Sequence, residues 1–262
     1  MEPTRVSDLN LVEGDIVLCY SGGIDSFVGS HYLATINLGS RALSAVYFNL
    51  GTKYSAKEVK YALELIANGK EVVTVDDSLA WLGRFEVGSK AFVPYRNLFI
   101  AMTAMAKYAP NVCICGLKDD AVADKNAEVF DEWSKHLTKI GNTPVKVFSP
   151  FWDMTKDDMV RWYLKSGGDP TFLERTVSCY SSEDTVYCGR CNCCFRKWVV
   201  LRNNGFDIPF HNKDMMAQYE MDCLEEKYDE HRRATTLTVI AEYRRTHEKR
   251  SITSHATTPT TH

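Results

Sequence analysis

The sequence predicts an α/β protein built on a doubly wound parallel sheet, with a small zinc-binding helical region at its C-terminal end. Short apolar runs rich in strand formers alternate with longer segments whose apolar residues recur at helical spacing. Such repeated β–α units form parallel sheets with right-handed crossovers and helices on both faces. Five cysteines crowd into residues 179–194, after the last of these units. This cluster predicts the appended metal-binding region.

The predicted elements follow one another in a regular order. Strands are predicted at residues 16–20, 43–49, 71–75, 112–116 and 145–148. Helices are predicted at residues 27–36, 55–68, 98–108, 127–140, 155–165 and 195–203, and over much of 215–250. Thr155 and Asp158 have the spacing of a capping box at the start of one helix. Residues 76–91 are expected to be irregular.

The turn after the first strand is a predicted phosphate site. A strand, a glycine turn and a helix start point free backbone N–H groups and the positive end of the helix dipole at one spot. Gly22 and Gly23 let the backbone approach an anion without a Cβ in the way. Ser21 and Ser26 add hydroxyl donors, and Ser26 also suits the N-cap position. Asp25 beside an anion indicates a divalent cation, as with ATP and Mg²⁺. The alternative is a simple tight turn capped by Ser26.

The cysteines of the C-terminal region have the spacing of metal ligands. Cys179, Cys188, Cys191 and Cys194 form the pattern C-x8-C-x2-C-x2-C. Four thiolates at such spacing suit a closed tetrahedral Zn²⁺ site. The alternatives are an iron–sulfur cluster, a disulfide pair or a chance grouping. Cys193 lies inside the last gap and is expected to be a bystander. A structural metal here would fix the C-terminal segment to the domain before it.

Composition and charge narrow the class of protein. The 262 residues are 45% hydrophobic and 25% charged, which is ordinary for a globular protein. The net charge of −3 gives no general affinity for nucleic acid, and no apolar run has the length of a membrane span. Residues 1–15 lack the apolar core of a signal peptide. We therefore expect a cytoplasmic protein that contacts neither a membrane nor nucleic acid directly.

Three regions are expected along the chain. Residues 1–170 form the ATP-binding α/β domain, and residues 171–250 form a zinc-binding and helical region packed on it. Residues 251–262 are rich in threonine and are expected to form a disordered tail.

The string Ser-Gly-Gly-Ile-Asp-Ser at residues 21–26 resembles the signature of the ATP pyrophosphatase (PP-loop) family. Further strings follow in order: Val93-Pro94-Tyr95-Arg96-Asn97, Ser149-Pro150 with Lys156, and Ser178-Cys179-Tyr180 with the remaining cysteines of the cluster. Over about residues 15–205 the chain resembles the 7-cyano-7-deazaguanine synthase family, the nitrile-forming enzymes of the queuosine pathway. The resemblance implies an adenine nucleotide alpha hydrolase-like, Rossmann-like fold.

The resemblance also implies a reaction. ATP adenylates the carboxylate of 7-carboxy-7-deazaguanine, ammonia displaces AMP to give an amide, and a second ATP drives dehydration to the nitrile. The leaving pyrophosphate would rest on Ser21, Gly22, Gly23 and Ser26. Asp25 would help to hold Mg²⁺. Arg96 suits a phosphate or carboxylate because its guanidinium binds such groups with two hydrogen bonds, the alternative being a surface salt bridge. Lys156 stands at a helix start, where an anionic ligand or simple exposure would explain a cation.

The chain departs from the family pattern at two places in the expected substrate site. Lys53 stands in a segment where the family has a Gln-Arg-His-like string, so it keeps a positive charge but loses the planar fork. The family's Tyr-Pro-Asp-Cys segment is reduced to Val122-Ala123-Asp124-Lys125. Asp124 matches the aspartate of that segment and is expected to accept hydrogen bonds from a guanine-like edge.

Two other classes of function are open alternatives. The first is another PP-loop enzyme that forms AMP, either a ligase or amidotransferase for a different substrate or a tRNA thiolase. The second is a non-catalytic nucleotide-binding module. For the synthase, the expected partners are a small deazapurine substrate and ammonia, and a homodimer is an open alternative to a monomer.

Overall fold

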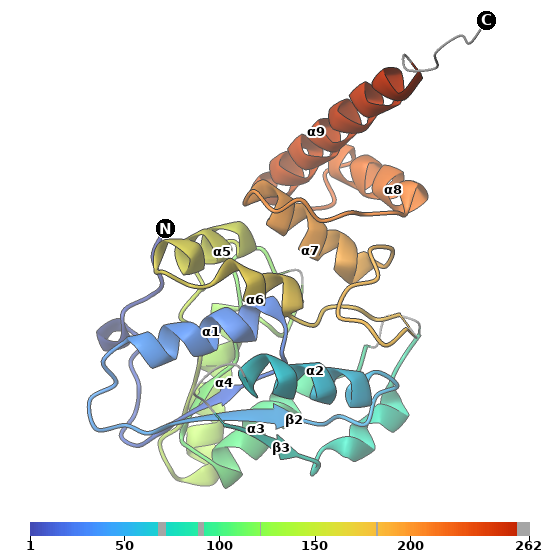
Figure 1. Ribbon diagram of the computed structural model, residues 1–262. Helices are drawn as coiled ribbons and strands as arrows, with labels where there is room; N and C mark the ends of the chain where they lie inside the picture. The colour runs from blue at the N-terminus through green and yellow to red at the C-terminus, as the bar shows by residue number, and fades with distance from the viewer. Residues whose placement is uncertain (68–71, 89–91, 121, 182, 256–262) are drawn as a thin grey trace, which may run out of the picture. The chain divides into compact units, whose positions relative to one another are not determined.

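The computed structural model describes residues 1–67, 72–88, 92–120, 122–181 and 183–255. It divides into two units, Met1–Cys188 and Gly189–His262, whereas the sequence placed the first boundary after residue 170. The first unit contains the sheet, and the second is helical in its described part (Figure 1).

The first unit consists of a sheet and its covering helices. The strands are β1 (Ile16–Cys19), β2 (Leu43–Phe48), β3 (Val73–Asp76), β4 (Asn111–Cys113) and β5 (Lys146–Phe148). The α-helices are α1 (Ile24–Thr35), α2 (Ser55–Ala67), α3 (Arg96–Lys107), α4 (Ala127–Gly141), α5 (Lys156–Lys165) and α6 (Pro170–Arg175). Short 3-10 helices are η1 (Val6–Asp8) and η2 (Ala80–Phe85).

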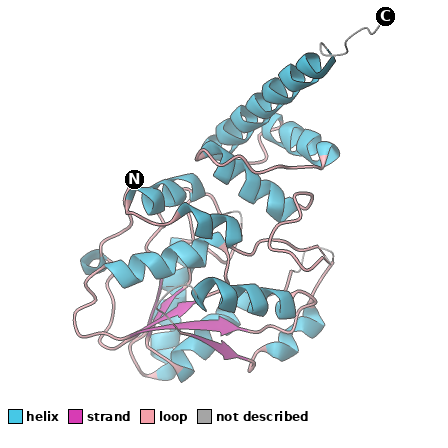
Figure 2. Cartoon of the chain, in the orientation of Figure 1, coloured by secondary structure: helices cyan, strands magenta, loops and turns pink. Residues whose placement is uncertain are grey.

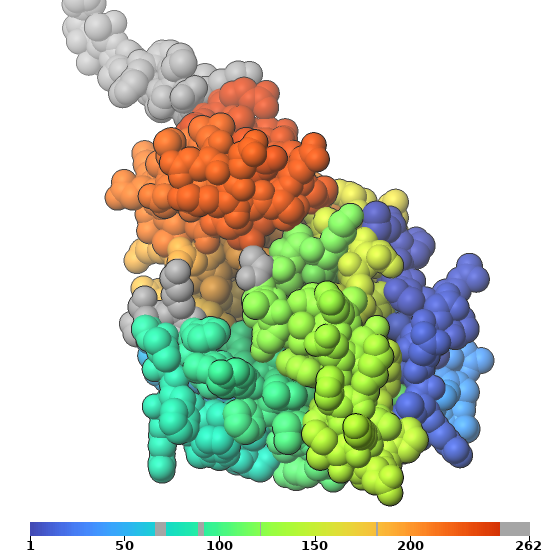
Figure 3. Space-filling view, turned by 180° about the vertical axis from the view of Figure 1, so that it is seen from behind, coloured from blue at the N-terminus to red at the C-terminus, as the bar shows by residue number. Residues whose placement is uncertain are grey.

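The sheet is parallel throughout, in the order β3-β2-β1-β4-β5. The helices α1 and α2 cover one face, and α5 and α6 pack on them (Figures 1 and 2). The helices α3 and α4 cover the other face, which Figure 3 shows in green from behind. The predicted doubly wound sheet is therefore confirmed. The chain order reverses at β1 and β4, and ligands of such folds bind at the carboxyl ends of the strands near this point.

The core lies between the sheet and its helices. Ile16, Val17 and Leu18 of β1 are fully buried, as expected for a central parallel strand covered on both faces. The buried cluster on the α3 side includes Val17, Val46, Phe48, Leu82, Val93, Ala101, Ala104, Val112, Phe130 and Val147. The fully buried Asn111 fastens the N-terminal segment to β4: its amide donates to the carbonyl of Val12 at 3.0 Å and accepts the N–H of Val12 at 2.9 Å.

Several element boundaries differ from the prediction. The expected irregular stretch 76–91 contains η2, and α6 occupies residues with no predicted helix. α3 begins at Arg96, two residues early, because Tyr95 takes a left-handed conformation (φ 58°) that turns the chain into the helix. The predicted helix end at residue 68 and strand start at residue 71 lie outside the described residues.

The second unit is built from α7 (Asn192–Asn203), α8 (Lys213–Leu224) and α9 (Glu230–His255). Phe195 stacks on Tyr219 with ring centroids 4.2 Å apart, and the ring nitrogen of Trp198 donates to the carbonyl of Ile208 at 3.1 Å. α9 continues to His255, within the predicted tail, whose residues 256–262 lie outside the described part. Among the described residues, no helix is both long and apolar enough to cross a membrane.

Candidate functional site

The Ser-Gly-Gly turn connects β1 to α1 at the carboxyl end of the central strand. Gly23, in an extended conformation (φ −74°, ψ 164°), is the N-cap of α1, and its carbonyl accepts the N–H of Phe27 at 2.9 Å. The expectation that Ser26 caps the helix is therefore wrong, because the helix begins two residues before it. The hydroxyl of Ser26 instead donates to the carbonyl of Gly23 at 3.2 Å and accepts the N–H of Ser21 at 3.1 Å. The two serine hydroxyls lie 3.1 Å apart in the turn.

The two glycines of the turn have different reasons to be glycine. Gly22 has a φ of +72°, and a Cβ there would lie 2.8 Å from the Cβ of Ala62 on α2. The fold itself therefore requires Gly22. Gly23 has an ordinary φ, and a Cβ there would meet only ordinary contacts of 3.4 and 3.5 Å. Room for a bound anion against the first turn of α1 is a reason for glycine at this second position, so the turn fits a phosphate group.

Asp25 lies in the first turn of α1 and faces two lysines. Lys156 at the start of α5 places its Nζ 2.9 Å from Oδ1 and 3.1 Å from Oδ2 of Asp25. The Nζ of Lys125 lies 3.9 Å from Oδ2 of the same carboxylate. Asp119 orients the start of α5 by accepting the backbone N–H of Lys156 at 3.1 Å. The structure thus brings together two predicted residues, Asp25 and Lys156, and adds Lys125, which the sequence analysis did not assign.

Lys125 is largely buried beside this carboxylate. Its Nζ lies 2.8 Å from Oδ2 of Asp120, which also accepts the backbone N–H of Leu117 at 3.2 Å. Burial alone lowers the pKa of Lys125, but the charges of Asp120 and Asp25 more than offset this and raise the pKa above its usual value. The side chain therefore carries its positive charge at neutral pH.

Asp124 precedes Lys125 and is held from the start of α3. Asn97, only 8% exposed, donates from Nδ2 to Oδ1 of Asp124 at 3.1 Å. The turn at Tyr95 places Arg96 and Asn97 in the first turn of α3, which gives the string 93–97 a clear structural role. Asn97 was not predicted as a site residue, because its partner lies 27 positions away in the sequence.

Arg96 and Lys53 belong to a second group of charges. The half-buried Glu58 accepts a hydrogen bond from the hydroxyl of Tyr47 at 3.0 Å. Burial raises the pKa of Glu58, while the hydrogen bond from Tyr47 and the charge of Arg96 offset part of that rise. The side chain of Lys53 is half exposed, and its Nζ lies 3.3 Å from Oε1 of Glu86. The ion pairs of the described residues thus join Lys53 to Glu86, and not to the carboxylates near α1.

The side chain of Ser149 links the segments that follow β4 and β5. Its hydroxyl donates to the carbonyl of Gly116 at 2.7 Å and accepts the N–H of the same residue at 3.0 Å. It also accepts the N–H of Phe151 at 3.1 Å. The Ser149-Pro150 string therefore fixes the segment that leads from β5 to Lys156.

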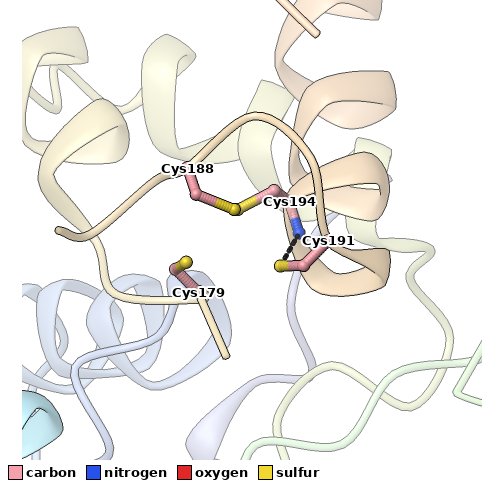
Figure 4. Close-up of side chains that lie close together, drawn as sticks. All are labelled: Cys179, Cys188, Cys191 and Cys194. Atoms are coloured by element: carbon pink, nitrogen blue, oxygen red, sulfur yellow. Dashed lines mark hydrogen bonds between the residues drawn. The ribbon is translucent and has the colours of Figure 1, made fainter. Parts of the chain in front are cut away.

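The four predicted cysteine ligands come together. The Sγ atoms of Cys179, Cys188, Cys191 and Cys194 all lie within 4.8 Å of one another, and Figure 4 shows the side chains gathered around one point. A tetrahedral zinc site with Zn–S bonds of about 2.3 Å would place its sulfurs about 3.8 Å apart. Cys191 is also the N-cap of α7 and accepts the N–H of Cys194 at 3.5 Å. Cys193 is not one of the four. Four thiols this close together could hold a metal ion.

The loop between the first two of these cysteines is held by α2. The ammonium of Lys57 donates to the carbonyl of Ser181 at 2.8 Å, and Lys60 pairs with Asp184 at 2.6 Å. Both contacts lie within the first unit. They fix the chain that carries Cys179 to the helix packed beside Gly22.

The comparisons with known proteins agree with this geometry. Residues 15–208 match the family model described as Queuosine biosynthesis protein QueC. A relative from Methanothermobacter thermautotrophicus is 28% identical, covering 72% of this chain and 95% of its own, and one from Archaeoglobus fulgidus is 31% identical, covering 74% and 88%. Both bear the name 7-cyano-7-deazaguanine synthase.

A solved structure of U34-tRNA thiolase NcsA from Methanococcus maripaludis, with its [4Fe-4S] cluster, has a TM-score of 0.44 at 14% identity. The match covers 94% of this chain and 76% of the thiolase chain. The family match spans most of the chain, from the start of β1 through α7. The chain therefore belongs to the QueC family of queuosine biosynthesis proteins, within the PP-loop superfamily.

Proposed function

We propose that this protein is an ATP-dependent ligase that converts 7-carboxy-7-deazaguanine and ammonia to 7-cyano-7-deazaguanine. One observation carries the proposal: in a chain of the QueC family, the Ser-Gly-Gly turn, Asp25 and Lys156 converge at the carboxyl end of the central strand. Helix N–H groups, two hydroxyls and a lysine are the donors that a pyrophosphate requires. The carboxylate among them suits a hard cation such as Mg²⁺.

The proposed chemistry divides into two activations. A carboxylate oxygen of the substrate attacks the α-phosphorus of ATP, and pyrophosphate leaves. Ammonia then adds to the activated carbon, and AMP leaves with that oxygen, so that an amide and a proton remain. The amide oxygen attacks a second ATP in the same way. AMP leaves with the oxygen as the nitrogen loses its protons, which yields the nitrile.

The residues of the turn are assigned to the leaving group. Ser21, Ser26 and the first N–H groups of α1 would bind the pyrophosphate, and Lys156 would turn to it from Asp25. Mg²⁺ held by Asp25 would neutralise charge on the phosphates. Fixed donors of this kind lower the barrier because they are in place before charge develops.

The loop at Asp124 is assigned to the deazapurine, and Arg96 to its carboxylate or to a phosphate. A carboxylate fixed by Asn97 suits the adjacent N–H donors of a guanine-like edge, because both of its oxygens accept hydrogen bonds. Arg96 stands one residue before Asn97, so the string 93–97 would serve both ends of the substrate. Lys53, paired with Glu86, is assigned to the margin of the same pocket.

Replacing Asp124 by Ala is expected to raise the KM for the deazapurine by about tenfold or more, since charged hydrogen bonds contribute roughly 1.5–3 kcal/mol. The KM for ATP should stay the same, and Asn97→Ala should act in the same direction with a smaller effect. Steady-state kinetics with each substrate varied in turn provide the measurement, with Asp131→Ala on α4 as the matched control. A rise in the KM for ATP alone would move this loop to the nucleotide site.

The metal centre is assigned to Zn²⁺ in a structural role. Four thiolates within 4.8 Å of one another suit a single tetrahedral ion better than the larger cage of an iron–sulfur cluster. Zinc bound to four cysteines has no open position, so it would supply folding energy and not catalysis. Reduced thiolate ligands are typical of a reducing compartment, which supports a cytoplasmic location.

A direct assay tests the whole proposal. Incubation with 7-carboxy-7-deazaguanine, ATP, Mg²⁺ and ammonium is expected to yield the nitrile by mass spectrometry, together with AMP and pyrophosphate. The same mixture without ammonium should give no nitrile. Zinc-loaded, folded protein that forms no AMP with this substrate would contradict the proposal.

The segment 122–125 favours a second candidate, an AMP-forming PP-loop enzyme that acts on another substrate. Here Lys125 turns toward Asp120 and Asp25, and Val122 is exposed. ATP–pyrophosphate exchange that depends on a different carboxylate would identify this alternative. The small substrate requires no contact with nucleic acid, and a homodimer stays a prediction from the sequence.

A further inference from the structure

Lys125 is a cation beside Asp25 that the proposed chemistry does not use. It lies on the loop between β4 and α4, next to Asp124, and its side chain is 17% exposed. Oδ2 of Asp120 holds its ammonium at 2.8 Å, and the N–H of Leu117 fixes Asp120 in turn. The position of the ammonium, 3.9 Å from Asp25, is therefore set from outside the turn.

The carboxylate of Asp25 has two ammonium groups where a cation would bind. Lys156 contacts both of its oxygens, and Lys125 approaches Oδ2 from the other loop. A divalent ion on this carboxylate would lie within a few ångströms of both positive charges. Like charges at such distances repel, and the repulsion is strong where water is partly excluded. An anion that both lysines can contact would remove it.

We propose that Lys125 is a second cation of the pyrophosphate site, which holds Asp25 in the nucleotide-free protein and moves to a phosphate oxygen when magnesium and nucleotide bind together. The inference rests on the proposed function, because it assumes a phosphate at the turn. The proposal implies that the divalent ion and the phosphate bind as a pair. The ion alone would be repelled by the two lysines, and the phosphate alone would be repelled by the carboxylate of Asp25.

Three segments meet at Asp25, so Lys125 can move from this carboxylate to a phosphate without a large change of the backbone. Asp25 belongs to the start of α1, Lys156 to the start of α5, and Lys125 to the loop that carries Asp124. A lysine side chain can change its partner by rotation about its own bonds, while the hydrogen bond from the backbone N–H of Lys125 to the carbonyl of Val122, at 3.0 Å, keeps the backbone in place. Asp124 directly precedes Lys125 in the chain. Movement of Lys125 to a bound phosphate would therefore also affect the position of the loop assigned to the deazapurine.

Binding of Mn²⁺ to the zinc-loaded protein tests the inference without any turnover. Equilibrium dialysis reports the Mn²⁺ bound to the protein, in the presence or absence of inorganic pyrophosphate, as the excess of Mn²⁺ on the protein side of the membrane. For the wild type, pyrophosphate is expected to raise the affinity for Mn²⁺ at least tenfold. In Lys125→Met, Mn²⁺ alone should bind several-fold tighter, and the enhancement by pyrophosphate should fall by about tenfold, the effect expected for one charge-assisted hydrogen bond.

Three further variants make each outcome decisive. Lys118→Met, on the same loop but exposed, should behave as the wild type. Asp25→Asn should lose Mn²⁺ binding, which identifies the ion's site. Lys125→Met combined with Asp120→Asn leaves no buried charge alone, and it replaces the single variant if that one does not fold.

The two proposals fail in different ways. If the wild type binds no Mn²⁺ with pyrophosphate, the assignment of the turn to ATP is wrong. If the wild type binds the pair but the Lys125 variants show the same enhancement, the turn stands and the role of Lys125 is overturned.

Discussion

Replacing Asp25 by Asn is expected to lower AMP release by about a hundredfold or more, the usual effect of losing one fixed group that stabilises charge in the transition state. Asparagine keeps the shape of the side chain but not its charge, so it should hold Mg²⁺ poorly against the pyrophosphate. The fold should survive, because Asn can still accept a hydrogen bond from Lys156, so that only the charge-assisted part of this contact, about 1 kcal/mol, is lost. The melting temperature should then change by only about 2–4 °C.

The measurement is AMP release with substrate and ammonium, with a thermal melt of each protein beside it. Asp214, an exposed acid in the first turn of α8, offers a matched control, since Asp214→Asn removes a comparable helix-end charge. This control should keep full activity. Near-normal turnover in folded Asp25→Asn would reduce Asp25 to a residue that only stabilises the start of α1.

Loss of the metal should have the largest effect on the fold. The purified protein is expected to contain about one zinc ion per chain, as in other four-thiolate sites. Cys188→Ser and Cys191→Ser should lose that ion and lower the melting temperature by about 10 °C or more, because the free energy of metal binding is also free energy of folding. Elemental analysis and thermal melts provide the two readings.

Cys193 supplies the control for the metal. It stands between two of the clustered cysteines in the sequence but is not one of the four. Cys193→Ser should therefore keep the zinc and most of the stability. A brown protein with visible absorbance would indicate an iron–sulfur cluster. Full metal content after the joint replacement of Cys188 and Cys191 would show that the ion is bound elsewhere.

The sequence predicted those features that depend on neighbouring residues. The strand, glycine turn and helix around residues 16–35 follow from local periodicity, and the capping box of Thr155 and Asp158 is present. The start of α6 had an overlooked local signal, because Asp169 as cap and Pro170 in the first turn are typical of a helix start. The cap of α1 was wrongly placed at Ser26, since a glycine with extended backbone can hold that position as well.

The missed residues of the site depend on contacts that sequence spacing does not encode. Lys125 resembles any loop lysine until the starts of α1 and α5 fold around it. Asn97 has a partner in another loop, and the pairing of Lys53 with Glu86 joins segments 33 residues apart. Each contact depends on the packing of the sheet as a whole, whereas the cysteines could be recognised because all four lie in one short segment.

The strand order also sets when this site can exist during folding. β1 is flanked by β2, its neighbour in sequence, and by β4, which Asn111 fastens to a residue 99 positions away. Contacts of such separation close late, because chain entropy opposes them. A chain that has paired only β1, β2 and β3 possesses the glycine turn but lacks both lysines, which follow β4. On the proposed function, nucleotide would recognise only the completed sheet and would draw the folding equilibrium toward it by mass action.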